Sequence, residues 1–120
     1  KYFKRKQSLV YNSKKKIFFD EIKIRISTLE DYIDQNNINT VHFMKIDTEG
    51  YEYEVLKGLG KKFDAVKLIM FEHHYHDMLQ KGYTFSDIHK LLTDNNFIKI
   101  FKAKMPFRKT FEYIYINRKK

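Results

Sequence analysis

The chain has 120 residues, which is enough for one domain with a modest core. Its 42% hydrophobic and 17% aromatic residues exclude a disordered composition, and the absence of cysteine excludes disulfides and thiolate metal sites. No apolar run approaches the ~18 residues that a membrane span requires, and the first residues lack the apolar core of a signal peptide. These features predict a cytoplasmic globular protein with no membrane span.

The net charge of +9 is concentrated at the two ends of the chain. Residues 1–16 contain seven basic residues and no acidic one, whereas residues 17–117 contain 14 basic and 15 acidic residues. A basic segment can bind nucleic acid or an anionic surface, but it can equally be a solvated tail. We favour the tail because no folded basic face accompanies it. We therefore divide the chain into a basic segment, 1–16, and a folded part, 17–120.

The first predicted elements are a strand and a helix. Isoleucines at 22, 24 and 26 alternate with charged residues, which predicts a half-buried strand that pairs with the apolar run 17–19 as a hairpin. Thr28 is a candidate helix cap, because acidic residues follow it in the first turn. We expect the helix to end near residues 35–37.

A strand over residues 41–46 comes next, and residues 47–50 end it sharply before a second helix. We expect this helix to bury an apolar face and expose a charged face. The apolar set is Tyr51, Val55, Leu56 and Leu59, and the charged set is Glu52, Glu54 and Lys57. Gly58 is placed to stop the helix.

The remainder predicts a central strand, a helix and two final strands. Residues 66–72 form a nearly continuous apolar run, typical of a strand covered on both faces. Thr84 or Ser86 can cap the next helix, and residues 97–103 and 111–117 alternate as two further strands. The order indicates an α/β fold, in which parallel strand–helix–strand units are closed by an antiparallel hairpin.

The sixteen residues from Phe43 to Gly58 resemble the signature of FkbM-type S-adenosylmethionine-dependent methyltransferases. In that family a strand leads to an Asp-x-Glu-Gly corner, here Asp47, Glu49 and Gly50, and an amphipathic helix follows. The resemblance implies a class I methyltransferase fold, which is Rossmann-like and has the strand order 3-2-1-4-5-7-6. This chain would supply strands 4 to 7, and strand 7, over 111–117, would lie antiparallel between strands 5 and 6.

The chain departs from the family at the cofactor site. The family holds S-adenosylmethionine through a glycine-rich turn between a strand and a helix, and none of the four glycines here forms such a turn. We therefore expect a carboxyl-terminal part of a methyltransferase that is inactive alone, as a fragment, one half of a split enzyme or a remnant. The cofactor-binding residues stay unassigned.

The candidate catalytic residues are Asp47, Glu72 and His73, which end two neighbouring strands. Open α/β sheets bind ligands at the carboxyl ends of their strands. Asp47 can accept the proton of a substrate hydroxyl, orient the acceptor or help to ligate a divalent ion; alternatively it only caps the next helix. His73 is a candidate base because histidine exchanges protons near neutral pH.

Glu49, Tyr51 and His76 are the candidate contacts to the acceptor, which we expect to be a sugar or another small molecule with a hydroxyl group. For Glu49 the alternative is a structural acid in the first turn of the helix. The histidines at 73, 74 and 76 do not follow a zinc pattern, so we assign no metal.

The partners expected besides the acceptor are an upstream methyltransferase half, or a second copy bound through the exposed edge of the strand at 41–46. Two other functions stay open at this point. One is a non-enzymatic basic module that binds nucleic acid through residues 1–16, and the other is a structural remnant that forms dimers.

Overall fold

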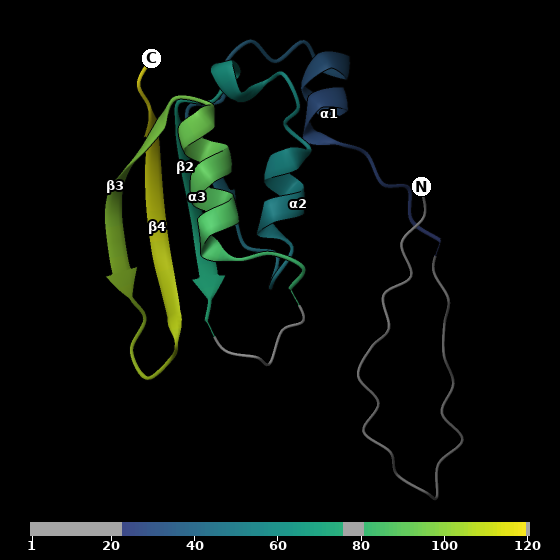
Figure 1. Ribbon diagram of the computed structural model, residues 1–120. Coiled ribbons are helices and arrows are strands. Elements are labelled where there is room, and N and C mark those ends of the chain that lie inside the picture. The colour runs from purple at the N-terminus through teal and green to yellow at the C-terminus, as the bar shows by residue number, and fades with distance from the viewer. Residues whose placement is uncertain (1–22, 76–80, 120) are drawn as a thin grey trace, which may run out of the picture.

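A computed structural model describes residues 23–75 and 81–119 as an α/β arrangement (Figure 1). Three helices, one short 3₁₀ turn and four strands follow one another along this part of the chain. They are α1 (Leu29–Gln35), β1 (Met44–Ile46), α2 (Glu52–Lys57), η1 (Phe63–Ala65), β2 (Leu68–His74), α3 (Phe85–Asp94), β3 (Phe97–Lys104) and β4 (Thr110–Asn117).

The four strands form one mixed sheet in the order β1-β2-β4-β3. β1 and β2 are parallel, with Ile46 opposite Phe71, whereas β4 is antiparallel to both β2 and β3. The prediction that the last strand lies antiparallel between its two neighbours is therefore confirmed. Because β1 and β2 are parallel, their carboxyl ends lie at the same edge of the sheet.

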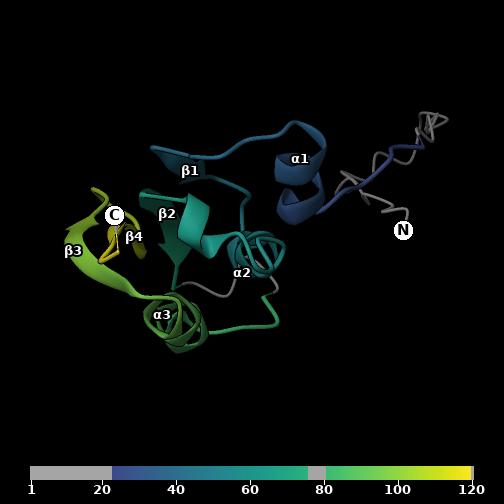
Figure 2. The ribbon, with the colours of Figure 1, turned by 90° about the horizontal axis from the view of Figure 1, so that it is seen from above.

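Helices α2 and α3 lie side by side on one face of the sheet (Figure 2). Inward-facing residues of β2 and β4 meet them there, and Ile69, Phe71, Tyr113 and Tyr115 are all fully buried. The ring of Phe71 stacks on those of Tyr113 and Tyr115, with ring centroids 5.5 and 5.8 Å apart. The core therefore lies between this face and the two helices.

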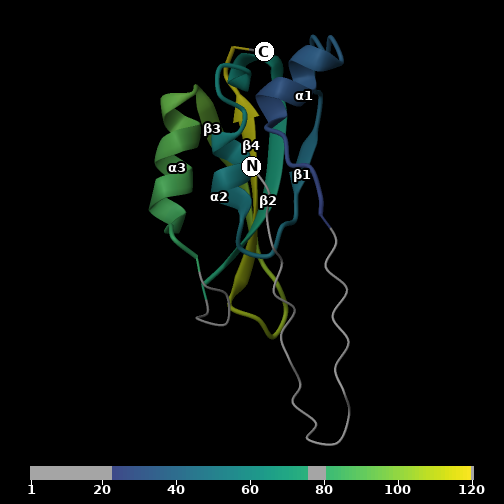
Figure 3. The same cartoon turned by 90° about the vertical axis from the view of Figure 1, so that its right-hand side faces the viewer.

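The opposite face of the sheet carries a different set of side chains. Met70 and Ile114 pair on this face and are half-buried. No helix of the described ranges lies over this face of the sheet (Figure 2). Helix α1 lies near β1, at the top of the view in Figure 3, and the backbone amide of Glu30 donates to the carbonyl of Gly58 over 2.8 Å. Within residues 23–75 and 81–119, no helix combines the length and the apolarity that crossing a bilayer requires.

The predicted caps are in place. The hydroxyl of Thr28 accepts from the amide of Asp31 over 3.1 Å. Thr84, rather than Ser86, caps α3, and its side chain and that of Asp87 form a reciprocal capping box. Such short polar caps satisfy amides that the first helical turn leaves unpaired, so their position can be predicted locally.

Two local predictions are wrong. Residues 23–28 contain no strand, and Ile24 and Ile26 are about half exposed, at 50% and 44%. The alternating pattern is present, but no described strand lies beside it to form backbone hydrogen bonds with it. The predicted partner, 17–19, lies outside the described residues. In α2, Glu52 is only 1% exposed whereas Tyr51 is 51% exposed, which reverses the roles predicted for these two residues.

Candidate functional site

The candidate site lies where β1 and β2 end. After β1 the chain turns through Asp47, Thr48, Glu49 and Gly50, which we call the corner. Glu49 and Gly50 have φ angles of 51° and 100°, in the left-handed region that glycine adopts most easily. These two residues redirect the chain from the sheet into α2.

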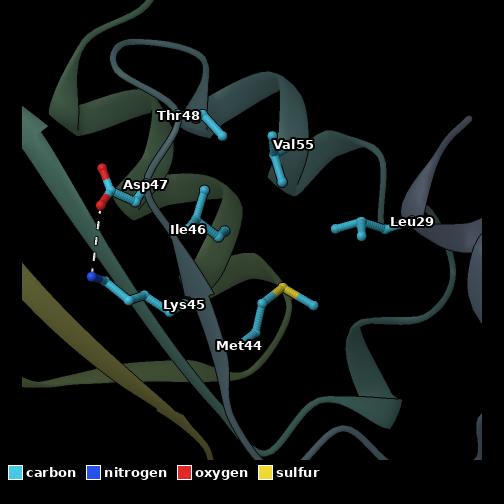
Figure 4. A pocket seen from close by; sticks show the side chains of 7 residues that line it. All are labelled: Leu29, Met44, Lys45, Ile46, Asp47, Thr48 and Val55. Carbon is cyan, nitrogen blue, oxygen red and sulfur yellow. Dashed lines mark ion pairs between the residues drawn. The ribbon is translucent and has the colours of Figure 1, made fainter. Parts of the chain in front are cut away.

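Asp47 and Glu72 lie on the open face of the sheet, away from α2 and α3. The side chain of Asp47 is 46% exposed, and a carboxylate oxygen lies 3.6 Å from the ammonium of Lys45 (Figure 4). Burial raises the pKa of Glu72, and the negative charges of Asp47 and Glu112 raise it further, against the opposing effect of His74 and Lys45. The carboxylate of Asp47 therefore lies close enough to Glu72 to raise its pKa.

His74 joins these carboxylates from the end of β2. It is 4% exposed, and its Nε2 lies 3.5 Å from a carboxylate oxygen of Glu49 and 4.0 Å from one of Glu72. Its Nδ1 lies 3.0 Å from the hydroxyl of Thr110. The structure thus brings Asp47, Glu49 and Glu72 together as the sequence predicts, and it adds His74, which the sequence analysis left without a role.

His73 lies on the other face of the same strand. It is 3% exposed and packs against the rings of Tyr75, Tyr83 and Phe85, with ring centroids 4.7, 6.0 and 5.7 Å from its own. Burial, with a smaller effect from the charge of Lys81, lowers the pKa of its imidazole to about 4. Its Nδ1 has no hydrogen-bond partner among the described residues.

The geometry separates His73 from the carboxylates, because successive residues of a strand point to opposite faces. The sequence pattern led us to place the candidate base at His73, whereas the structure places His74 beside the carboxylates. Tyr51 is exposed beside the corner, and His76 lies outside the described residues.

The alternative structural roles of Asp47 and Glu49 are not observed. Helix α2 has Tyr51 at its N-cap, with no capping hydrogen bond from a side chain, so Asp47 does not cap it. Glu49 precedes the helix, and the acids in its first turn are Glu52 and Glu54.

Glu52 is a residue of this site that the sequence analysis missed. One of its oxygens accepts from the amide and the hydroxyl of Thr48, over 3.3 and 3.1 Å, and from the amide of Gly50 over 3.0 Å. The other oxygen accepts from the hydroxyl of Tyr83. Burial raises the pKa of Glu52, but these hydrogen bonds outweigh it and hold the pKa below its usual value. The sequence did contain one signal for this role. A sharp turn leaves backbone amides without partners, and a nearby carboxylate is a suitable hydrogen-bond acceptor for them.

A hollow of about 460 Å³ lies beside β1 (Figure 4). It is lined by Leu29, Met44, Lys45, Ile46, Asp47, Thr48 and Val55. Its lining is mainly apolar, with Asp47 and Lys45 among the polar side chains, and its walls come from the start of α1, from β1 and from α2. Among residues 23–75 and 81–119, no group of three or more His, Asp or Glu side chains has the arrangement that would hold a metal ion.

The fold and the site together define an α/β domain with an acidic site at the carboxyl ends of two parallel strands. The methyltransferase FkbM domain matches residues 3–99 of the 120-residue chain, and the chain therefore belongs to this family. No curated protein and no solved structure matches the chain. Family membership confirms the resemblance and indicates a methyltransferase, a class of enzyme that generally uses S-adenosylmethionine.

The described residues do not by themselves make an S-adenosylmethionine site. The hollow beside β1 has walls only from β1, α1 and α2, and the sequence has no glycine-rich turn between a strand and a helix that would let the backbone approach the cofactor.

Proposed function

We propose that this chain provides the residues that bind the methyl acceptor in an S-adenosylmethionine-dependent methyltransferase. The proposed acceptor is a hydroxyl group of a sugar or another small metabolite. The observation that carries the proposal is the meeting of Asp47 and Glu72 at the ends of two parallel strands in a member of the FkbM family. The strand order and the antiparallel β4 support assignment of the sheet to the carboxyl-terminal half of a class I methyltransferase fold.

Asp47 is the proposed base. Methylation of a hydroxyl oxygen releases the hydroxyl proton, and a carboxylate within hydrogen-bond reach accepts it. Asp47 suits this role because its side chain is 46% exposed and its one ion-pair partner among the described residues, Lys45, lies at 3.6 Å, which leaves an oxygen accessible.

Glu72 and His74 are proposed to bind and orient the acceptor. Glu72 lies at the end of β2 with the imidazole of His74 beside it, 4.0 Å from a carboxylate oxygen, so both groups can hydrogen-bond to a hydroxyl of the acceptor. Glu49, beside His74, is placed to contact the acceptor from the corner. His73 is proposed to support the fold instead, because its ring is buried on the far side of the sheet.

An exposed aromatic ring beside this edge supports a sugar as the acceptor. Tyr51 directly follows the corner and is 51% exposed. Tyr75, which follows β2, instead packs against His73 and Tyr113 on the helix-covered face. Flat rings with one apolar face and one polar end suit contact with a sugar, which has both kinds of surface.

The outer edge of β1 is the proposed contact to a partner. β1 is an edge strand of the sheet, and Phe43, immediately before it, is 54% exposed. Edge strands offer unpaired amides and carbonyls that pair readily with another strand. The proposed partner is an upstream methyltransferase segment, which would complete the cofactor site, or a second copy of the chain.

Methyl transfer to a panel of sugars and small hydroxyl compounds tests the function. The protein is incubated with S-adenosylmethionine labelled in its methyl group, alone and with the upstream part of its reading frame supplied as a second chain. Recovery of the labelled methyl group as a methyl ether on a hydroxyl oxygen of one acceptor class supports the proposal. Absence of both transfer and cofactor binding by calorimetry, with the upstream part present, contradicts it.

A further inference from the structure

We infer that Glu52 is a positioning residue, which holds the corner and the segment before α3 in one arrangement and thereby places Asp47 against the acceptor. The inference rests on the proposed function, because it assigns Glu52 a role through Asp47 and not direct contact with the acceptor. It concerns the buried carboxylate of Glu52, whereas the carboxylates of the proposed site, Asp47, Glu49 and Glu72, are exposed or partly exposed.

The first step is that hydrogen bonds to Glu52 fix the conformation of the corner. One Glu52 oxygen receives three hydrogen bonds, two of them from the backbone amides of Thr48 and Gly50. These amides flank Glu49, whose φ of 51° is strained for a residue with a side chain. Thr48 directly follows Asp47 in the chain. A fixed Thr48 therefore limits where the Asp47 carboxylate lies.

The second step is the connection from Glu52, through residues 81–83, to the end of β2. The other Glu52 oxygen accepts from Tyr83, which is 9% exposed and stands 31 residues further along the chain. The ammonium of Lys81, two residues earlier, donates to the backbone carbonyl of His74 at the end of β2. Residues 81–83 are thus tied both to the corner and to the strand that carries Glu72.

The third step is that ordinary helix capping does not explain this arrangement. An acidic residue in the first turn of a helix usually stays near solvent, where the helix dipole alone favours it. Glu52 is instead 1% exposed, and removing its partners would leave a buried charge, which is costly. Glu54, on the same turn, shows the ordinary case, because it is exposed and its one side-chain partner within residues 23–75 and 81–119 is Lys57, at 3.1 Å.

Four variants test the inference. Glu52→Gln removes the charge with little change in shape, and Glu54→Gln is its matched control on the same helix. Tyr83→Phe removes only the link to residues 81–83, and Tyr53→Phe is its control because the Tyr53 ring packs 5.4 Å from that of Tyr83 but its hydroxyl makes no contact with Glu52. Each variant is studied by two-dimensional NMR of the 120-residue chain and by methyl-transfer kinetics.

For NMR, we expect Glu52→Gln to shift the amide resonances of Thr48 and Gly50 and to speed their hydrogen exchange by about tenfold or more. Tyr83→Phe should shift residues 81–84 more than the corner, and both controls should leave all these signals in place. A folded Glu52→Gln variant with unchanged Thr48 and Gly50 signals overturns the inference.

For kinetics, we expect Glu52→Gln to lower kcat about tenfold or more while KM for the acceptor stays within about twofold, because a displaced base slows the reaction more than it weakens binding. An equal loss in Glu54→Gln overturns the inference. Absence of transfer by the unsubstituted protein overturns the proposed function and the catalytic half of the inference, and the NMR result then still decides whether Glu52 holds the corner.

If Glu52→Gln does not fold, a pH titration of the unsubstituted chain replaces it. The amide shifts of Thr48 and Gly50 should follow the carboxyl carbon of Glu52, with one common midpoint. Unrelated midpoints overturn the inference, because a carboxylate that holds two amides must move their resonances when it is protonated.

Discussion

The two faces of the sheet differ most sharply at the end of β2, where adjacent residues occupy different chemical environments. His73 faces α3 and is buried, and this burial lowers the pKa of its imidazole to about 4. Its neighbours Glu72 and His74 face the opposite way and meet the corner after β1. The difference shows that the helix-covered face buries its side chains in the core, whereas the open face carries the polar groups that we propose for the site.

The comparison predicts that chemistry depends on the open face. We expect Asp47→Asn to lower kcat for methyl transfer by about 10²–10⁴-fold, the range that loss of a positioned base produces. Stability should change little because the side chain is 46% exposed. The measurement is the initial rate with the best acceptor of the panel, and a variant that keeps full activity would remove Asp47 from the site.

Folding should depend on the helix-covered face. Phe71 is fully buried against Tyr113 and Tyr115, so we expect Phe71→Ala to lower the free energy of unfolding by about 3–5 kcal/mol. Met70 is its half-buried neighbour on the open face, and Met70→Ala should lower the free energy of unfolding by about 1 kcal/mol. Urea unfolding measures both, and equal losses would mean that something outside the described residues covers the open face.

The buried imidazole of His73 should make stability depend on pH. The unfolded chain binds a proton at this residue near pH 6.5, whereas the folded chain binds it only near pH 4. Between these values the unfolded state holds more protons, so stability falls as the pH drops, by about 2 kcal/mol from pH 7 to pH 5.

His73→Phe should remove most of that dependence and leave stability at pH 7 within about 1 kcal/mol, because the ring has no partner at Nδ1 among the described residues. Urea unfolding at several pH values checks this result. His42→Gln is the control, since His42 is exposed. The same pH dependence in both variants would show that His73 is not the responsible group.

The smallest effect is expected at Glu72. Its pKa is raised by burial and by the charges of Asp47 and Glu112, so Glu72→Gln should stabilise the fold at pH 7 by about 0.5 kcal/mol. The gain should disappear as the pH falls through the raised pKa, because the native carboxyl group is then neutral as well. Thermal unfolding at pH 7 and at acidic pH checks the sign, and a loss of stability at pH 7 contradicts it.

The local features of the fold could be predicted from the sequence because they depend on neighbouring residues. Thr28 and Thr84 cap helices through amides three positions away. The apolar run near residues 66–72 forms a strand for a similar local reason, since its composition suits burial on a sheet. The isoleucines at 24 and 26 show the limit, because their alternation lacks a described strand beside it.

The site could be predicted in part. The common position of Asp47 and Glu72 could be predicted because parallel strands end at a common edge, a rule that needs only the order of the elements. The choice between His73 and His74 could not be made in that way, since it depends on the face that α3 covers. Glu52 was predicted to be exposed because helical periodicity uses only neighbouring residues. The hydroxyl of Tyr83, which donates to the buried Glu52 carboxylate, lies 31 positions away.

The sequence by itself determined that this chain is an α/β domain of the FkbM family with acidic residues at two strand ends, because hydrophobic period, caps and the Asp47 corner are all local. Only the tertiary structure decided which side of the sheet each of these residues faces and that Glu52 is buried beneath the corner. Burial and hydrogen bonding between distant segments depend on how the helices pack, and a pattern of neighbouring residues does not contain that information.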